Sequence, residues 1–340
     1  MKALRLFVCA FASAFACATY AQDDGFYRGR TISMVIGHEV AGGFDVYARA
    51  LIRHMPRYIP GNPGMVPQNM LGAVGLVSAN WLYNIAPKDG SAMAIFAPSN
   101  LVDPLLGEGQ GKFDITRFTW IGNMDESVAL CVTTKESGVT SFDIMRQKET
   151  IVGASGSGVA GPLSQTARAV KNLLGGNIRV IQGYKGAPSI RLAMQKNEVQ
   201  GICGIPLATV QSEWLGDLQS GGFIPVLQMG RQKHADLPNV AHAFDYVKSP
   251  EERQLFDLVF GLQSLGRPFA APPDIPPARA KILRDAFDAT LRDSEFLAEA
   301  AKLRLTIKAT SGLEMEKQLA AVYALPKPLI ERARQAVRAD

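Results

Sequence analysis

The stretch from Thr31 to Arg49 constrains the fold more than any other part of the chain. An apolar, β-branched run from Ile32 to Ile36 ends at Gly37, and beyond the pair Gly42-Gly43 apolar residues recur at helical spacing. This pattern predicts a strand, a glycine-rich loop and a helix. The first N–H groups of such a helix lack partners, and its dipole is positive there, so the loop is a candidate anion site. The alternative is a turn that only connects a strand to a helix.

The first residues have the features of a cleaved secretory signal. Two basic residues precede an apolar stretch from Leu6 to Ala18, and small residues follow up to Ala21. We therefore expect residues 1–21 to be removed and the mature chain to begin near Gln22. A lipoprotein anchored through Cys17 is the alternative, but the residues before this cysteine form a poor lipobox. No later run reaches the roughly 18 apolar residues of a membrane-spanning helix, so we expect an exported protein without one.

Size and charge narrow the classes of protein. Removal of 21 residues from the 340-residue chain leaves 319, which is enough for two domains, and it changes the formal net charge from +5 to +3. This small surplus without a basic run argues against a nucleic-acid partner. Two of the four cysteines leave with the signal, so a disulfide between Cys131 and Cys203 depends on a distance that the sequence does not give.

Predicted strands and helices alternate along the chain, which is typical of βαβ units and of a mostly parallel sheet flanked by helices. After the opening unit, strands at Met65–Met70 and Ala92–Ala97 flank a helix that ends at Asn84. Ligands of such sheets bind at the carboxyl ends of the strands, where Ser99 is expected to lie. We place a crossing into a second lobe near Asp125–Leu130.

The second lobe repeats this architecture without repeating the sequence. Its predicted strands are Thr150–Gly153, Ile178–Gln182, Val199–Cys203 and Ile224–Met229. Its predicted helices are Pro162–Leu174, Ser189–Lys196 and one that begins at Pro206. The chain is expected to return near Val226–Gly230. The helices predicted after that point are Pro250–Phe260, Pro276–Leu291, Ser294–Leu303, Gly312–Tyr323 and Pro326–Val337.

A glycine-rich segment from Gly156 to Gly161 matches the dinucleotide-binding fingerprint and lies between a predicted strand and a predicted helix. The fingerprint also needs an acidic residue about 20 positions later, and Leu173–Lys185 contains none. No nicotinamide or flavin cofactor is therefore expected. We interpret the segment as a second anion site with hydroxyl groups from Ser155 and Ser157.

Patterns for catalysis and metal binding are incomplete. Gly153 to Ser157 lacks the last glycine of the nucleophile elbow of serine hydrolases. None of the four histidines pairs with another at helical spacing, so no metal site is predicted, and His54 is expected to be structural. The loop Tyr184–Gly186 is either a solvated turn or a ligand contact. Its expected position beside the glycine-rich segment favours the contact.

Several segments occur in an order that resembles a known family. They are Phe26–Ile32, Gly42–Arg49, Ala86–Gly90, Gly156–Gly158, Tyr184–Gly186 and Leu237–Val240. The chain resembles the periplasmic receptors of tripartite tricarboxylate transporters, also called Bug-type solute-binding proteins, over nearly all of its mature length. The resemblance implies an α/β fold of the periplasmic-binding-protein type, in which a hinge and a cleft separate two lobes. We expect lobe 1 to comprise residues 22–127 and 229–340, and lobe 2 residues 128–228.

The resemblance also implies a function. Such receptors are not enzymes: they close on a small organic acid, hold it largely through backbone N–H groups and deliver it to an integral-membrane permease. We expect a monomer in the periplasm. One alternative is an exported enzyme that uses the same cleft, although no nucleophile, base and orienting acid can be assembled from neighbouring motifs. The other is a receptor domain that serves signalling.

Carried over by position, the expected ligand contacts come from both lobes. They are His38, Glu39, Val40, Ala41, Gly42 and Gly43 with Asp45 as support, Ser155, Gly156, Ser157, Gly158, Tyr184, Lys185, Gly186, Ala187 and Gln200. Ser99 is added because of its expected place at a strand end.

Some of these positions depart from the family's pattern. Ala41 replaces a frequent third glycine, His38-Glu39 replaces a Pro-aromatic pair, and Gln200 replaces a frequent aspartate. Glu39 fits an anion site least well, because like charges repel. It must turn to solvent, pair with a cation such as His38, or receive a positive group of the ligand.

Overall fold

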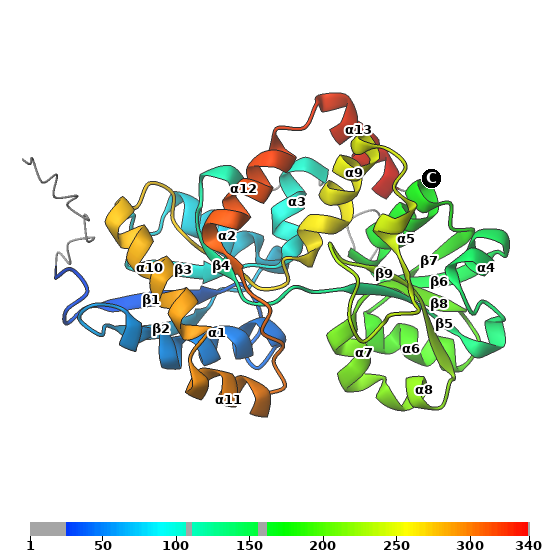
Figure 1. Ribbon diagram of the computed structural model, residues 1–340, viewed down its shortest axis with the longest axis horizontal. Helices are drawn as coiled ribbons and strands as arrows, with labels where there is room; N and C mark the ends of the chain where they lie inside the picture. Colours follow the sequence, from blue (N-terminus) through cyan, green and yellow to red (C-terminus); the bar gives the residue numbers. More distant parts are fainter. Residues whose placement is uncertain (1–24, 107–110, 156–161, 339–340) are drawn as a thin grey trace, which may run out of the picture.

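The computed structural model describes residues 25–106, 111–155 and 162–338. Figure 1 shows that they form two lobes side by side, each a sheet with helices around it. The predicted signal, residues 1–21, lies outside the described residues, and so do Gly156, Ser157 and Gly158. Among the helices of the described ranges, none combines the length and the apolar character needed to cross a membrane.

Lobe 1 is built on a six-stranded mixed sheet in the order β12-β4-β11-β3-β1-β2. Its strands are β1 (Thr31–Ile36), β2 (Gly64–Asn69), β3 (Ala92–Ile95), β4 (Thr119–Asn123), β11 (Pro268–Ala271) and β12 (Thr310–Ser311). Strand β1 pairs in parallel with β2 and β3, whereas β11 runs antiparallel between β3 and β4. The sequence pattern did not predict β11 and β12, which enter the sheet from the last third of the chain.

Helices cover both faces of this sheet because the side chains of β1 alternate between two cores. Met34 and Ile36 join the core under α1 (Gly43–His54), α10 (Pro277–Thr290) and α11 (Ser294–Lys302). Val35 joins the other core, under α2 (Leu76–Asn84), α3 (Pro98–Leu106) and α12 (Gly312–Tyr323). The predicted unit of strand, glycine-rich loop and helix is therefore confirmed as β1, the loop and α1.

Lobe 2 holds the second six-stranded sheet, in the order β10-β9-β5-β8-β6-β7. Its strands are β5 (Ala129–Thr134), β6 (Thr150–Ser155), β7 (Ile178–Tyr184), β8 (Gly201–Pro206), β9 (Phe223–Met229) and β10 (Ala241–His242). Strand β5 runs antiparallel to β8 and β9, and the other pairs are parallel. The lobe's helices are α4 (Phe142–Gln147), α5 (Pro162–Leu174), α6 (Ala187–Gln195), α7 (Leu207–Glu213) and α8 (Leu215–Gln219), and α9 (Pro250–Phe256) follows β10.

A disulfide joins the two inner strands of lobe 2. Cys131 of β5 and Cys203 of β8 lie opposite each other with their Cα atoms 4.0 Å apart, and both are fully buried. This resolves the pairing that the sequence left open. The bond ties together two strands that are 72 residues apart along the chain.

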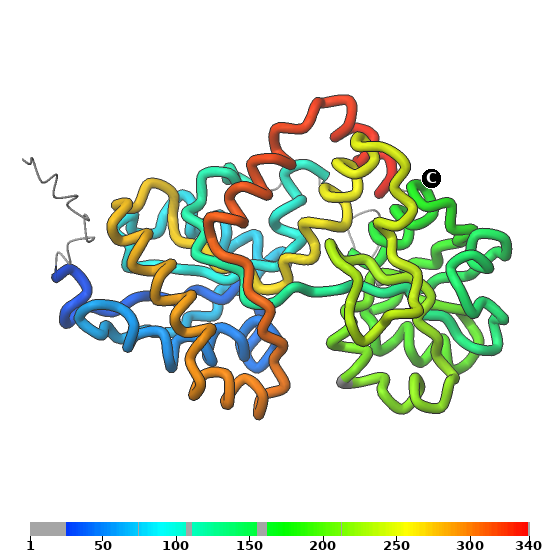
Figure 2. Tube along the Cα trace, in the orientation of Figure 1, coloured from blue at the N-terminus to red at the C-terminus, as the bar shows by residue number. Residues whose placement is uncertain are grey.

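Two segments cross between the lobes. The first follows β4 at the predicted position, and Figure 2 shows it as the teal tube between the lobes. The second crossing was predicted wrongly at Val226–Gly230. Strand β9 continues to Met229 inside the second sheet, and β10 adds residues Ala241–His242, so lobe 2 does not end at residue 228. The chain returns through residues 257–267 into β11.

The two crossings form a short antiparallel ladder. The N–H of Ser127 donates to the carbonyl of Ser264 at 2.8 Å, and the N–H of Gly266 donates to the carbonyl of Asp125 at 2.8 Å. The buried Asn123 fixes both segments, since its side chain donates to the carbonyl of Asp125 and accepts from the N–H of Arg267, each at 2.8 Å. The junction between the lobes is therefore a hydrogen-bonded pair of segments.

Helix α13 (Lys327–Val337) bridges the lobes a second time, and it lies above both of them in Figure 1. It contacts α3 of lobe 1 and α5 of lobe 2. The Nε of Arg334 donates to the carbonyl of Leu105 at 2.6 Å, and the side chain of Asn172 donates to the carbonyl of Ala336 at 3.0 Å. One short helix thus holds both lobes by hydrogen bonds.

Candidate functional site

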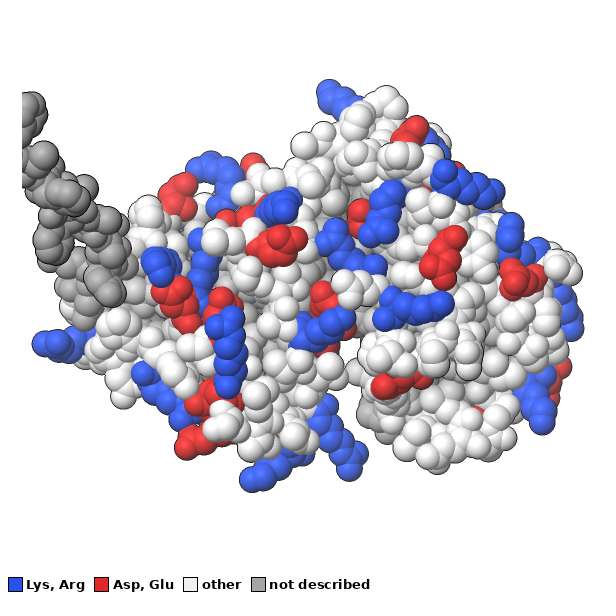
Figure 3. Space-filling model, in the orientation of Figure 1, with Lys and Arg blue, Asp and Glu red and all other residues white. Residues whose placement is uncertain are grey.

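A cavity of about 290 Å³ lies between the lobes, beside their crossings. His38 follows β1, Ala97 follows β3 and Pro206 ends β8, and all three line it. The cavity therefore lies at the carboxyl ends of strands from both sheets, as the strand pattern predicted. Figure 3 shows the surface hollowed where the lobes meet at the lower edge, and acidic and basic residues interspersed over this face.

Three helices begin at the cavity. Phe44 is the second residue of α1, Ser99 is the second residue of α3 and Pro162 opens α5, and each lines the wall. Gly42 occupies the N-cap of α1 and no side chain caps its first turn. The positive ends of three helix dipoles therefore meet at one place, with free N–H groups at α1.

Arg267 is the one charged residue among the described residues that line the cavity. Its guanidinium carbon lies 4.4 Å from the ring centre of Phe44 and 4.8 Å from that of Tyr47, so two aromatic faces hold it in place. Its Nη1 donates to the carbonyl of Gly266 at 2.6 Å, whereas its Nε is buried and has no partner among the described residues. Burial lowers the pKa of Arg267, against the effect of Tyr47 and Asp125, yet an arginine stays charged.

The ring of His38 stacks on the ring of Phe44, with centres 3.9 Å apart and an angle of 19° between the planes. Burial, and then the charge of Arg267, lower the pKa of His38 to about 4. The ring is therefore neutral at neutral pH, and its buried Nδ1 has no partner in the described part of the chain. A neutral His38 provides no charge to balance Glu39. Glu39 is exposed, as the first alternative required.

Asp45 supports the first loop, as the sequence predicted. Its carboxylate accepts from the N–H of Ala41 at 2.9 Å and from the side chains of Arg49 and Asn69 at 2.8 and 2.9 Å. Although burial raises the pKa of Asp45, these hydrogen bonds hold it below its usual value. Ala41 has φ +64°, a backbone conformation that favours glycine, which explains why a third glycine is expected there.

Most of the other predicted contacts that the structure describes are not part of the cavity wall. Of the predicted residues that the structure describes, His38 and Ser99 line the cavity, while Val40 is exposed in the neighbouring loop. Tyr184 ends β7 and packs against a core cluster of lobe 2, and Lys185 is exposed. The backbone of Ser155 ends β6, and its side chain is not among the described atoms.

The prediction for Gln200 conflicts with its position. Gln200 immediately precedes β8, at the end of the sheet opposite to Pro206 and the cavity. Its side-chain oxygen accepts from the N–H of Ile151 at 2.8 Å, which joins the starts of β8 and β6. This residue therefore braces the sheet.

Sequence reasoning missed most of the polar wall. Arg267, Gln263, Gln165 and Thr166 all line the cavity and were not proposed. One signal was available: Arg267 stands between a glycine and a proline, directly before the short apolar run of β11. A charged residue beside a strand end indicates a ligand site as much as a glycine-rich loop does.

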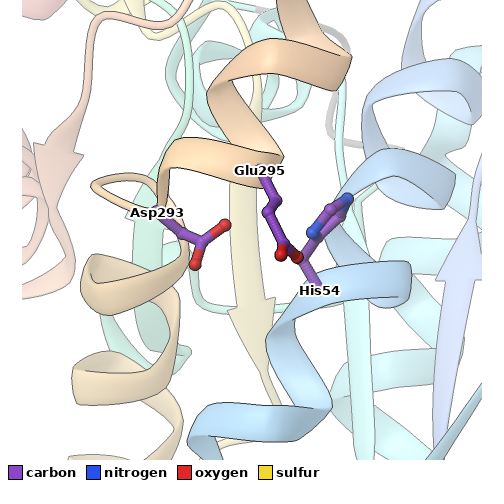
Figure 4. A group of neighbouring side chains, drawn as sticks. All are labelled: His54, Asp293 and Glu295. Atoms are coloured by element: carbon purple, nitrogen blue, oxygen red, sulfur yellow. The ribbon is translucent and has the colours of Figure 1, made fainter.

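A second polar cluster lies on lobe 1, and Figure 4 shows His54, Asp293 and Glu295 close together. Their ligand-type atoms lie within 4.8 Å of one another. The guanidinium of Arg57 bonds to all three, at 2.6 Å to His54, 2.7 Å to Asp293 and 2.5 Å to Glu295. The other ring nitrogen of His54 bonds to Glu299 at 2.5 Å. The cluster is an ion-pair network, and His54 has the structural role that was predicted.

No protein-family model matches the sequence, and no characterised protein sequence does. Solved structures do match. A TctC solute-binding protein from Polaromonas has a TM-score of 0.70 at 18% identity, over 90% of this chain and 99% of that chain. MatC from Rhodopseudomonas palustris with bound malate has a TM-score of 0.59 at 15% identity, over 91% of this chain and 99% of that chain. An R. palustris protein with adipate has a TM-score of 0.62 at 17% identity, over 89% of this chain and 97% of that chain. This chain has the two-lobed fold of TctC-type and Bug-type periplasmic solute-binding proteins.

Proposed function

We propose that this protein is a periplasmic receptor that captures a small organic anion between its lobes and delivers it to the permease of a tripartite tricarboxylate-type transporter. One observation carries the proposal: three helix starts and one arginine converge on a cavity whose described lining contains no carboxylate. Proteins of the same fold have been solved with malate and with adipate, which supports an organic acid. The expected export signal agrees with a periplasmic location.

Electrostatics explains why an anion is favoured here. Two opposite unit charges about 4 Å apart attract by roughly 4 kcal/mol at an effective dielectric near 20. The uncapped N–H groups of α1 add donors that are already oriented, so binding costs little reorganisation. The ligand is therefore expected to dock with its carboxylate toward lobe 1.

Closure of the lobes would complete the site. The cavity wall contains residues of both lobes, and the hydrogen-bonded crossings beside it provide an axis for rigid-body rotation. Small-angle scattering with and without a bound acid tests this, and a smaller radius of gyration is expected with ligand. Proven binding with an unchanged radius would contradict closure.

Thermal unfolding with a panel of ligands tests the proposal itself. The panel contains mono-, di- and tricarboxylates, aromatic acids, amino acids and the uncharged amides of the same acids. A true ligand at about a hundred times its dissociation constant stabilises the fold by about 2.7 kcal/mol, which raises the melting temperature. At least one acid should do so where its amide does not. If only uncharged compounds shift the melting temperature, the receptor takes a different class of ligand.

A further inference from the structure

We infer that Arg267 is the anchor for a single ligand carboxylate and that the ligand is a monocarboxylate with an apolar body. The inference rests on the proposed function and specifies its ligand class. Its starting point is two residues of the cavity wall, Arg267 and His38, that each keep one nitrogen without a hydrogen bond. The Nε of Arg267 and the Nδ1 of His38 are both buried, and neither has a partner among the described residues. A buried polar atom without a partner is costly, so a ligand group that reached either nitrogen on closure of the lobes would remove that cost.

Arg267 is preorganised for this contact. Phe44 and Tyr47 hold the plane of the guanidinium, and one of its nitrogens is fixed on the carbonyl of Gly266. Its Nη2 lies 3.2 Å from the point where a side chain at Gly43 would begin. The guanidinium therefore lies directly beside the start of α1. A cation at the positive end of a helix dipole is unfavourable, and an anion between the two relieves the repulsion.

The described wall provides one full positive charge for the ligand, that of Arg267, which forms no ion pair with a described carboxylate. Asp125 lies close enough to interact with Arg267 electrostatically, but the two form no ion pair. A first ligand carboxylate meets a charged donor. Among the described residues of the wall, a second carboxylate would have only neutral donors, such as Ser99 and Thr166. Hydrogen bonds to neutral donors are about half as strong as those to charged donors.

The rest of the wall is apolar. Val102, Ala129, Met229 and Phe260 come from both lobes and the second crossing, and they surround the ligand space together with Pro206. Contact with these side chains stabilises hydrocarbon that is removed from water, whereas a charged group pressed against them loses its hydration. The amide of Gln263 is already used, since it donates to the carbonyl of Val259 at 3.0 Å.

Matched ligands on the unaltered protein test the inference by isothermal calorimetry. Phenylacetate is compared with phenylacetamide, which lacks the charge, and with phenylmalonate, which adds a carboxylate to the same body. Hexanoate and adipate form a second pair. Phenylacetate should bind about 10- to 100-fold more tightly than phenylacetamide, from the loss of a charge-assisted hydrogen bond. Each monocarboxylate should bind at least about 10-fold more tightly than its dicarboxylate.

The variant Arg267→Gln tests whether Arg267 is the residue that distinguishes the acid from its uncharged amide. The change should weaken phenylacetate binding by about 10- to 100-fold and leave phenylacetamide within about threefold of its original affinity. Arg253→Gln is the control, because Arg253 also stacks on an aromatic ring, that of Phe244 at 4.5 Å, but does not line the cavity. It should change neither affinity. If Arg267→Gln does not fold, the matched ligands on the unaltered protein decide the ligand class.

The possible failures are distinguishable. If adipate or phenylmalonate binds as tightly as its monocarboxylate, or if only dicarboxylates bind, the inferred ligand class is wrong and the receptor function stands. If Arg267→Gln weakens the acid and the amide equally, the arginine supports the wall without recognising the charge. If neither these probes nor any acid of the wider panel binds, the proposed function itself fails.

Discussion

The two lobes contribute different chemistry to the same cavity. On the side of lobe 1, Arg267, Phe44 and His38 form a stack of one cation and two rings. Lobe 2 contributes neutral residues, among them Gln165 and Thr166. The members of the stack contact one another within lobe 1, so a change in the angle between the lobes leaves them in place. The contribution of lobe 2 depends on that angle.

Because of this difference, the two lobes can have separate roles: lobe 1 selects the ligand, and lobe 2 holds it after closure. Lobe 1 can recognise the charge of a ligand while the lobes are open, because its cation and the start of α1 are already in position. Lobe 2 can add hydrogen bonds and exclude water only when it approaches. The lobes also differ in how they are braced: in the described residues, the one disulfide lies in lobe 2. Changes in each lobe should therefore have separable effects.

The largest effect is expected from the brace of lobe 2. Replacing both Cys131 and Cys203 with alanine should lower the free energy of unfolding by about 2 to 5 kcal/mol, because the bond closes a loop of 72 residues. Denaturant unfolding measures this loss of stability. A reductant should lower the free energy of unfolding of the original protein by a similar amount and should leave that of the variant unchanged. Ligand affinity should stay within about twofold, because neither cysteine lines the cavity. If the double variant folds but does not bind ligand, the disulfide of lobe 2 also affects the binding site, and the two lobes do not have separable roles.

The next effect concerns Asp125, in the first crossing. Burial raises its pKa from 3.8 to about 6; Arg267 acts against this shift, Glu126 adds to it, and Lys308 acts against it. A raised pKa means that the fold disfavours the charged carboxylate. The contribution of this carboxyl to the free energy of unfolding is therefore fully present below about pH 4 and is lost as the pH rises through about 6. Asp125→Asn should be more stable than the original protein by roughly 2 to 3 kcal/mol at pH 7, and the gain should vanish near pH 4.

Thermal unfolding across this pH range measures the difference. Asp285→Asn is the control, because Asp285 is an exposed carboxylate paired with Lys281. Its stability should follow that of the original protein at every pH. A constant difference between Asp125→Asn and the original protein would show that this carboxyl does not titrate in the window.

A smaller effect is expected from the neutral wall of lobe 2. Thr166→Val keeps the shape of the side chain and removes its hydroxyl group from the cavity wall. The affinity should fall by about 1 kcal/mol, or roughly fivefold, for a charged ligand and for its amide alike. Calorimetry with phenylacetate and phenylacetamide checks this. A loss restricted to the charged ligand would mean that lobe 2 also selects charge.

The smallest effect belongs to Glu39. This residue is exposed, so Glu39→Gln should change ligand affinity by less than about threefold. Calorimetry at low and at physiological salt measures it. A large gain at low salt would place the carboxylate of Glu39 against the bound anion, and a large loss would indicate that it receives a cationic group.

The sequence predicted the elements that local pattern determines. The helix Pro162–Leu174 has the bounds that were expected, because proline at its first position and glycines after its end mark both limits. Helix α3 was missed because Pro98 and Pro104 fall at its start and in its interior. Strand β11 was missed because it has four residues and opens with a proline.

The site was predicted in outline for a similar reason. Glycine-rich loops and strand ends are local signals, and they indicated the edge of both sheets at which the cavity lies. Arg267 reaches that edge because β11 inserts between β3 and β4, a long-range pairing that no local pattern determines. Gln200 was placed wrongly because it lies one residue before β8, at the opposite end of the sheet.

The route of the chain between the sheets also sets an order of assembly. All strands of the second sheet lie within residues 129–242, without interruption by the first sheet. The first sheet needs β11, and the second bridge between the lobes needs α13. During synthesis lobe 2 can therefore complete its sheet before β11 joins β3 to β4. We expect pulse-labelled hydrogen exchange during refolding to protect β5 and β8 before β3 and β4, so that the lobe begun second is finished first.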